Sequence, residues 1–184
     1  MAADDELYSR FLAGDNSAFD ELILRYTGRL VLYLNGLTHN MADAEDLVID
    51  SFATILMKKP AIREGNFQAY LYKAARNRAT RFHAIRRRMP TFSLEDQQVE
   101  EIMAVRPEDE YLRDERLQAV RRCLNRIQPE PREALWLVYC EEMSYSEAAA
   151  VLGVNAKKVH NWLTKGKQLM KTELAKEGIT HADE

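Results

Sequence analysis

A chain of 184 residues is long enough for one large domain or two small ones. Hydrophobic residues make up 46% of it, which argues against global disorder, and the low content of glycine (7) and proline (5) favours helices over a turn-rich β fold. The net charge of −3 averages blocks of alternating sign, −5 for residues 1–60, +7 for 61–90, −6 for 91–117 and +1 for 118–184. This pattern is typical of a DNA-facing strip, an acidic tether and an acidic protein-facing surface, although chance patchiness of a solvated surface would also produce it.

Two helices are predicted in the first third of the chain. The turn and N-cap residues 14–17 begin the first one, and its apolar side chains recur at helical spacing up to Leu34. Gly36 and the polar residues 38–40 break that pattern. The second helix has acidic side chains in its first turns, where the helix dipole favours anions, and Pro60 ends it.

A third helix is predicted after Gly65 and Asn66, with one apolar side and one basic side. Aromatic residues alternate with its cations, and this combination suits an unpaired nucleic-acid strand, because cations hold phosphates and aromatic faces stack on unpaired bases. The alternative is that Phe67, Tyr70 and Leu71 are core residues and only the arginines are exposed. For Tyr70 and Leu71 we expect the core.

The acidic residues 91–112 lack helical periodicity and contain Pro107, which predicts a flexible linker. It would join a domain of residues 1–90 to a domain of residues 113–184. The predicted fold class is therefore all-α, with two small helical domains joined by an acidic linker.

The second domain has the pattern of a helix-turn-helix motif. Ser144 and Glu147 are spaced as a capping box for a short helix over residues 145–152, Gly153 supplies the turn, and Asn155 caps a longer basic helix. In such a motif the start of the second helix enters the major groove, where asparagine can pair with adenine and lysine can reach guanine or phosphate. The candidate DNA contacts are Asn155, Lys157, Lys158, His160, Asn161 and Lys165. A helical hairpin with a solvated lysine face is the alternative, and Trp162 is expected in the core rather than at the DNA.

No catalytic, metal or cofactor site is predicted. The four histidines have no partnered nucleophile or metal spacing, and Asp46 and Asp50 share a helix face without a second pair of ligands. Cys123 and Cys140 are expected to be buried thiols in a reducing cytoplasm. The acidic N-terminus is not a secretory signal, and residues 30–42 are too short and too polar for a membrane span. We therefore expect a cytoplasmic protein that does not insert into a membrane.

Four sequence strings carry a resemblance that covers nearly the whole chain. In order, they are AGDNSAFDEL, DAEDLVIDSF, FQAYLYKAARN and REALWLVYCEEMSYSEAAAVLGV, and together they resemble the extracytoplasmic-function sigma factors. The resemblance implies a helical domain for the promoter −10 element, a linker and a helical domain for the −35 element. The partners it implies are core RNA polymerase, at the β′ clamp helices and the β flap, promoter DNA, and an anti-sigma factor as a further candidate.

The resemblance also assigns residues. It places Asp46, Ile49 and Asp50 in polymerase docking, although the family usually has glutamine at the position of Ile49. Residues 59–66 correspond to the loop that captures a flipped −10 base in the family. The candidate −10 contacts are Arg63, Asn66, Phe67, Lys73, Arg76, Asn77, Arg81 and Arg86. The recognition helix keeps the family frame with an altered polar face, so we expect either an unusual −35 preference or weak reading of the −35 element.

The function expected from the sequence is promoter-specific transcription initiation, without chemistry of its own. A stand-alone helix-turn-helix regulator would explain the second domain, but it gives no role to the acidic helix or to the aromatic and basic helix. A helical protein-interaction module and a helical enzyme are the remaining alternatives.

Overall fold

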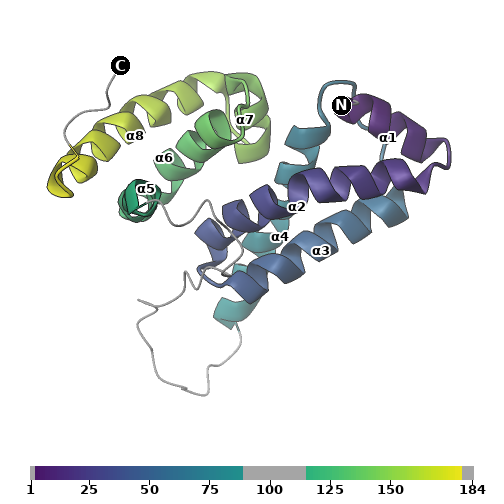
Figure 1. The fold of residues 1–184 in the computed structure, drawn as a ribbon, viewed down its shortest axis with the longest axis horizontal. Helices are drawn as coiled ribbons and strands as arrows, with labels where there is room; N and C mark the ends of the chain where they lie inside the picture. The colour runs from purple at the N-terminus through teal and green to yellow at the C-terminus, as the bar shows by residue number, and fades with distance from the viewer. Residues whose placement is uncertain (1–2, 89–114, 180–184) are drawn as a thin grey trace. The chain divides into compact units, whose positions relative to one another are not determined.

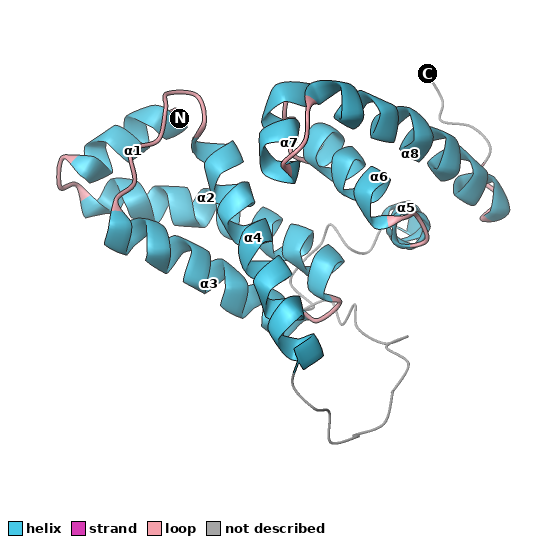
Figure 2. Cartoon of the chain, turned by 180° about the vertical axis from the view of Figure 1, so that it is seen from behind, coloured by secondary structure: helices cyan, strands magenta, loops and turns pink. Residues whose placement is uncertain are grey.

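The computed structural model describes residues 3–88 and 115–179, and within these ranges every regular element is a helix (Figures 1 and 2). The all-α prediction is confirmed. The chain divides into two compact units, Met1–Ile102 and Met103–Glu184. The predicted linker, residues 91–112, lies outside the described residues. Among the helices that are described, none is long and apolar enough to cross a membrane.

The described part of the first unit, residues 3–88, contains four helices. They are α1 (Asp4–Leu12), α2 (Asn16–Thr38), α3 (Met41–Lys58) and α4 (Phe67–Arg88). Helix α2 packs against the other three. Helix α2 begins within the predicted group of N-cap residues, since the Asp15 carboxylate accepts from its first amides. Helix α3 is capped by Asn40, whose side chain accepts from the Asp43 amide at 3.0 Å, and this cap was not predicted.

The core of the first unit is rich in aromatic rings, and α1 supplies two of them. Phe11 stacks on Phe19 with 4.4 Å between ring centroids, and Tyr8 lies 5.2 Å from Phe67. The sequence analysis did not predict α1. The short acidic segment that forms it becomes helical because Leu7, Tyr8 and Phe11 are buried against the rest of the unit.

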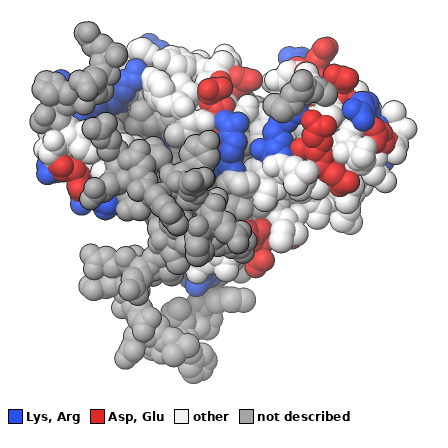
Figure 3. All heavy atoms as spheres, in the orientation of Figure 1, with Lys and Arg blue, Asp and Glu red and all other residues white. Residues whose placement is uncertain are grey.

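Polar contacts fix α1 to α2 as well. The Asp4 carboxylate accepts hydrogen bonds from the Arg25 guanidinium and the Tyr26 hydroxyl. At the α1–α2 turn, Arg10 pairs with Asp15 at 2.6 Å. On the face drawn in Figure 3, acidic and basic side chains accordingly lie beside each other at this end of the unit.

In the second unit, residues 115–179 form four α-helices and one π-helical turn. They are α5 (Glu115–Asn125), α6 (Pro129–Leu135), η2 (Trp136–Cys140), α7 (Tyr145–Leu152) and α8 (Ala156–Lys176). Helix α8 packs against α5, α6 and α7. The predicted helix-turn-helix is confirmed, with the capping box between Ser144 and Glu147 and with Gly153 in the left-handed conformation at φ +70°.

The turn η2 was not predicted. It carries Trp136, whose indole nitrogen donates to the buried Glu141 carboxylate at 3.0 Å, so the acid that follows the turn has a polar partner inside the unit. The expectation for the cysteines is half correct, because Cys123 is buried and Cys140 is exposed.

Close packing between α6 and α8 depends on Gly166. A methyl group at this position would lie 2.9 Å from Leu135 Cδ1 and 3.3 Å from the Pro131 carbonyl oxygen, both on α6. We expect Gly166→Ala to lower the free energy of unfolding of the second unit by about 1–2 kcal/mol, because overpacking outweighs the gain in helix propensity. Both tryptophans of the chain, Trp136 and Trp162, lie in this unit, so their fluorescence during urea unfolding measures the effect.

Gly28 provides the matched control for this prediction. It lies in α2, and an added methyl group would meet nothing within 4 Å. Gly28→Ala is expected to raise the free energy of unfolding of the first unit by up to about 1 kcal/mol, as followed by far-UV circular dichroism. A stabilised Gly166→Ala variant would show that α6 and α8 are not packed as described.

Candidate functional site

Helix α3 presents an outward face that is both acidic and apolar. Asp46, Ile49 and Asp50, the predicted docking residues, are all exposed, and Ile49 is 65% exposed. Met57, near the end of the same helix, is 84% exposed. Large apolar side chains in such positions indicate contact with another protein when they are grouped with charges. We call the group Asp46, Ile49 and Asp50 the α3 face.

Helix α3 is connected to α4 by ion pairs. Arg78 on α4 lies 3.9 Å from the Asp50 carboxylate and also donates to the Thr54 hydroxyl. Further along, Arg86 pairs with Asp43 at 2.9 Å. These contacts are largely exposed and stabilise the unit little, but they orient two of the cations that the sequence assigns to one basic strip.

The exposed side of α4 forms a narrower strip than the sequence suggested. Lys73, Asn77 and Arg81 are exposed and follow each other at intervals of four residues, so they share one side of the helix. Tyr70 is 36% exposed and belongs to the same side. We call Tyr70, Lys73, Asn77 and Arg81 the α4 strip. Of the other predicted contacts on this helix, Arg76 is half-buried and Arg86 faces Asp43 on α3.

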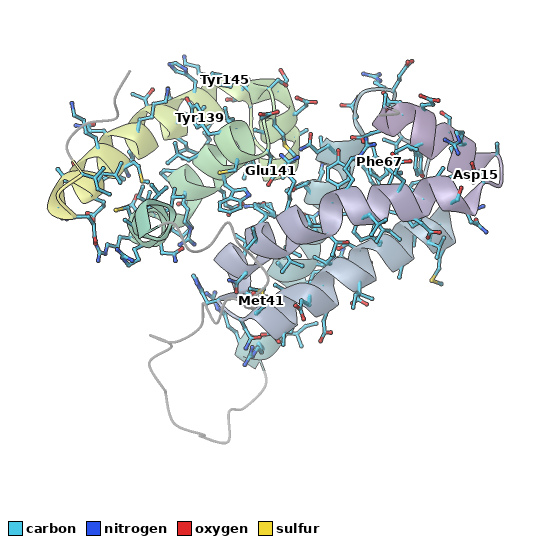
Figure 4. The ribbon with its side chains drawn as sticks, in the orientation of Figure 1. Asp15, Met41, Phe67, Tyr139, Glu141 and Tyr145 are labelled. Atoms are coloured by element: carbon cyan, nitrogen blue, oxygen red, sulfur yellow. The ribbon has the colours of Figure 1, made fainter. Side chains whose placement is uncertain are left out.

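Phe67 has no place in the α4 strip. It is 2% exposed, and its ring lies among those of Tyr8 and Tyr26 at 5.2 and 5.9 Å (Figure 4). Its predicted stacking on a base is therefore wrong, and it is a core residue. The expectation for Tyr70 was wrong in the opposite sense, since this ring reaches the surface, whereas Leu71 is buried as expected.

The two remaining predicted contacts of the first unit, Arg63 and Asn66, lie in the loop between α3 and α4. Arg63 is exposed and its carbonyl oxygen accepts from the Asn66 amide at 3.1 Å, which closes a tight turn before α4. The Asn66 side chain donates to the Glu64 carbonyl oxygen at 3.0 Å. The turn therefore leaves the Arg63 side chain outside and uses one donor of Asn66 internally.

In the second unit, the start of α8 carries the predicted group of polar side chains. Lys157, Lys158, His160 and Asn161 are exposed on its first turns. Asn155 acts as the N-cap, since its side chain accepts from the Lys158 amide at 2.8 Å. The Lys158 ammonium lies over the half-buried Trp162 ring at 5.1 Å from its centroid. Trp162 is thus neither a fully buried core residue nor freely exposed.

Lys165 lies about one turn after this group and has a contact of its own. Its ammonium donates to the Gln128 side chain at 2.6 Å, from the segment between α5 and α6. The contact is exposed, so the charge of Lys165 remains accessible at the surface.

Two aromatic residues beside α8 were missed in the sequence analysis. Tyr145 at the start of α7 lies 6.1 Å from the His160 ring, and the Lys167 ammonium lies 5.0 Å from the centroid of the Tyr139 ring (Figure 4). A hydrogen bond with Tyr139 raises the pKa of Lys167, which keeps its ammonium charged. The seven-residue spacing of His160 and Lys167 could have indicated their common side, but it does not reveal the two tyrosines.

The described residues contain no group of three or more acidic, histidine or cysteine side chains that could hold a metal ion. The described surfaces are an acidic and apolar face on α3, a basic and aromatic strip on α4, and the lysine-rich start of α8 in the other unit.

Comparison with known protein families agrees with this arrangement. The model of sigma-70 region 2 matches residues 22–89, and that of sigma-70 region 4 matches residues 117–170. The chain is 29% identical over 168 residues to the ECF RNA polymerase sigma factor SigE of Mycolicibacterium smegmatis, in an alignment that covers 89% of this chain and 65% of SigE. It is 28% identical over 160 residues to the RNA polymerase sigma-H factor of Pseudomonas aeruginosa, with 81% of this chain and 82% of that protein covered.

Solved structures with the same fold include two complexes. The fold is similar to that of CnrH, solved with the cytosolic domain of CnrY, at a TM-score of 0.67 and 22% identity over 95% of this chain and 98% of that one. It is also similar to RpoE of Bartonella quintana, solved with the anti-sigma factor NepR, at a TM-score of 0.64 and 21% identity over 85% of this chain and 96% of that one.

Asn155 caps α8, and the contribution of this cap to the stability of the second unit can be measured. Asn155→Ala removes the acceptor for the Lys158 amide and is expected to lower the free energy of unfolding of the second unit by about 1 kcal/mol. Asn155→Ser keeps an N-cap acceptor and should stay within a few tenths of the wild type. Tryptophan fluorescence during urea unfolding separates the two variants, and equal values for them would contradict the capping role.

Proposed function

Because the chain belongs to the sigma-70 family, in its extracytoplasmic-function group, we propose that it directs RNA polymerase to specific promoters and aids their opening. The observation that carries the proposal is the presence of three distinct surfaces on one chain, the α3 face, the α4 strip and the start of α8. A stand-alone regulator of the helix-turn-helix type would need only the last of them. We propose no chemistry of its own for the protein, and we place its action in the cytoplasm, where polymerase works.

The proposed division of labour follows the two units. Residues 1–90 bind core polymerase and the promoter −10 element, and residues 113–184 bind the −35 element. Residues 91–112 connect the two domains. Each unit has its own buried core and its own polar surface, which supports separate tasks. Within the polymerase, the partners would be the β′ clamp helices for the first unit and the β flap for the second.

For polymerase docking, we propose that Ile49 is the apolar centre of the contact and that Asp46 and Asp50 flank it. An exposed isoleucine gains free energy when a partner covers it, and two carboxylates select a partner surface that is basic around its apolar centre. Ile49 stands where the family usually has glutamine, so this contact would depend more on burial of apolar surface and less on hydrogen bonds.

For the −10 element, we propose that the α4 strip holds one strand of the opened promoter. Lys73 and Arg81 would contact phosphates, and Tyr70 offers the ring face that was first expected from Phe67. Asn77 lies between them with an amide that can reach a base edge. Arg63 and Asn66 would contribute from the preceding loop, and Arg76 and Arg86 would contribute only after leaving their present surroundings.

For the −35 element, we propose that α8 enters the major groove with its first turns. Lys157, Lys158, His160 and Asn161 are exposed there and would read bases, with Asn155 capping the helix beneath them. Tyr145 and Lys167 lie beside this group and could contact the flanking backbone. An anti-sigma factor is proposed as a further partner, because both CnrH and RpoE were solved in complexes and RpoE was solved with such a factor.

The central test is whether promoter binding requires core polymerase. We expect the purified protein to bind duplex promoter DNA poorly by itself and tightly with core polymerase. Asp46→Arg combined with Asp50→Arg should abolish binding to core polymerase in a pull-down, because like charges set against a basic partner cost several kcal/mol in favourable cases. The α-helical circular dichroism should be unchanged, since both side chains are exposed.

The matched control for this variant is Glu6→Arg with Asp20→Arg, which makes the same change of charge at exposed positions of α1 and α2. It should bind core polymerase like the wild type. Undiminished binding of the α3 double variant would reject the α3 face, and tight promoter binding without polymerase would favour the stand-alone regulator.

The second test separates base reading from phosphate binding on α8. Lys165→Ala should weaken holoenzyme binding to all promoter sequences about equally and reduce the slope of log affinity against log salt by about one unit. Gln128→Ala removes the partner of Lys165 but keeps the charge, so it should leave the slope unchanged. By contrast, Lys158→Ala and Asn161→Ala should alter the preferred −35 sequence by roughly 1–3 kcal/mol at the affected base pair. Unchanged preference in both variants would contradict the role of the recognition helix.

A further inference from the structure

Helix α1 holds both ends of the loop between α3 and α4, the segment of residues 59–66 (Figure 2). At the start of the loop, the Tyr8 hydroxyl donates to the Pro60 carbonyl oxygen at 2.7 Å. At its end, the Asp5 carboxylate accepts from the Gly65 amide at 2.7 Å. Asp5 and Tyr8 are three residues apart, so they lie on the same side of α1.

Other contacts support the same two points. The Lys59 ammonium lies 4.8 Å from the centroid of the Phe11 ring, and the Tyr8 ring packs against Phe67, the first residue of α4. Tyr8 is 4% exposed, and burial raises its pKa to about 12, so its hydroxyl remains a donor even in alkaline solution near pH 10. Gly65 has a φ of +75°, a backbone conformation that other residues rarely adopt, so the loop also has a fixed bend at its second attachment.

Between the two attachments lie only four residues, 61–64, of which Ala61, Arg63 and Glu64 are exposed. A short segment tied at both ends can take few conformations, so little entropy remains to be lost when it binds a ligand. Of the two side chains that tie the loop, Tyr8 is 4% exposed and would not touch the ligand, whereas Asp5 is half-buried and is already bonded to the loop backbone.

The attachment of α1 itself does not depend on these contacts. Leu7 and Phe11 are fully buried, and Asp4 is bonded to Arg25 and Tyr26 on α2. The hydrogen bond of Asp5 is exposed and so adds little to the stability of the fold. The hydrogen bond of Asp5 instead fixes the position of the Gly65 amide and thereby the geometry of the loop.

We propose that Asp5 and Tyr8 are positioning residues that hold residues 61–64 in the shape that receives an unpaired base of the −10 element. Helix α1 would thereby contribute to promoter selectivity without touching DNA. This inference rests on the proposed function for its ligand, but the rigidity of the loop can be measured without one.

The test uses Asp5→Ala and Tyr8→Phe in the full chain, with two matched controls. Glu6→Ala makes the same change of charge on the same turn of α1 at an exposed site, and Tyr33→Phe removes a hydroxyl from another buried tyrosine, on α2. The first measurement is amide hydrogen exchange over residues 59–66 in the free protein. The second is the rate of open-complex formation by the holoenzyme on promoters that differ at single −10 bases.

We expect both test variants to exchange faster in the loop and to lose discrimination between −10 bases by roughly three- to tenfold each, the equivalent of one hydrogen bond. Binding to core polymerase and preference at the −35 element should stay as in the wild type. The two controls should match the wild type in both measurements, apart from overall stability in Tyr33→Phe.

Each outcome has a distinct meaning. Unchanged exchange in the loop would overturn the claim that α1 holds it. Faster exchange with unchanged discrimination would overturn the claim of selectivity, and an equal loss in the controls would assign the effect to stability. If the wild-type holoenzyme itself showed no preference among −10 bases or no opening, the proposed function would fail, and the exchange data would still decide whether α1 fixes the loop.

Discussion

Burial of Phe67 against α1 and α2, together with burial of Leu71, Ala75 and Ala79, determines which side of α4 faces outward. The Phe67 ring lies among those of Tyr8 and Tyr26 at the first turn of the helix, at one edge of that buried side. Lys73 and Asn77 lie opposite the buried row and therefore face solvent. The strip proposed to hold DNA therefore depends in part on an aromatic contact made by a helix that is remote from it in the sequence. The same contact joins α1 to the loop that precedes α4.

The orientation of α8 is set in a comparable way by small and branched residues. Val159, Leu163 and Gly166 are buried at intervals of four and three residues, and Gly166 comes within contact distance of α6. This buried row leaves Lys157 and Asn161 on the opposite side of the first two turns. Capping by Asn155 fixes where the helix begins, so the buried row and the cap together place the polar side chains. The polar face can thus change in sequence while its position stays the same.

Much of this could be predicted from local signals. The capping box at Ser144 and the N-caps at Asp15 and Asn155 were identified from the sequence, because a cap depends on residues that are neighbours in the chain. The signals failed where distant segments decide the outcome. Phe67 and Tyr70 differ by three positions and lie near the border between the two sides of α4, so helical spacing alone could not tell which ring is buried. The answer comes from α1, a short acidic segment that gave no helix signal and becomes helical only through burial. The exposed pair Tyr139 and Tyr145 was missed for the same reason.

The charge pattern was informative as a whole but not residue by residue. The block of residues 61–90 has a net charge of +7, yet two of its arginines are turned toward carboxylates of α3, Arg78 to Asp50 and Arg86 to Asp43. Net charge therefore overstates the number of cations that are ready to contact a phosphate. Each pair joins an exposed partner to a half-buried one, since the Arg78 side chain is 30% exposed and the Asp43 side chain 24%, so both pairs stabilise the fold little. Arg78 also donates to the Thr54 hydroxyl, so its guanidinium is directed toward α3 and not toward the α4 strip. The cations that remain for the α4 strip are Lys73 and Arg81, and exposure of the side chain, rather than net charge, identifies them.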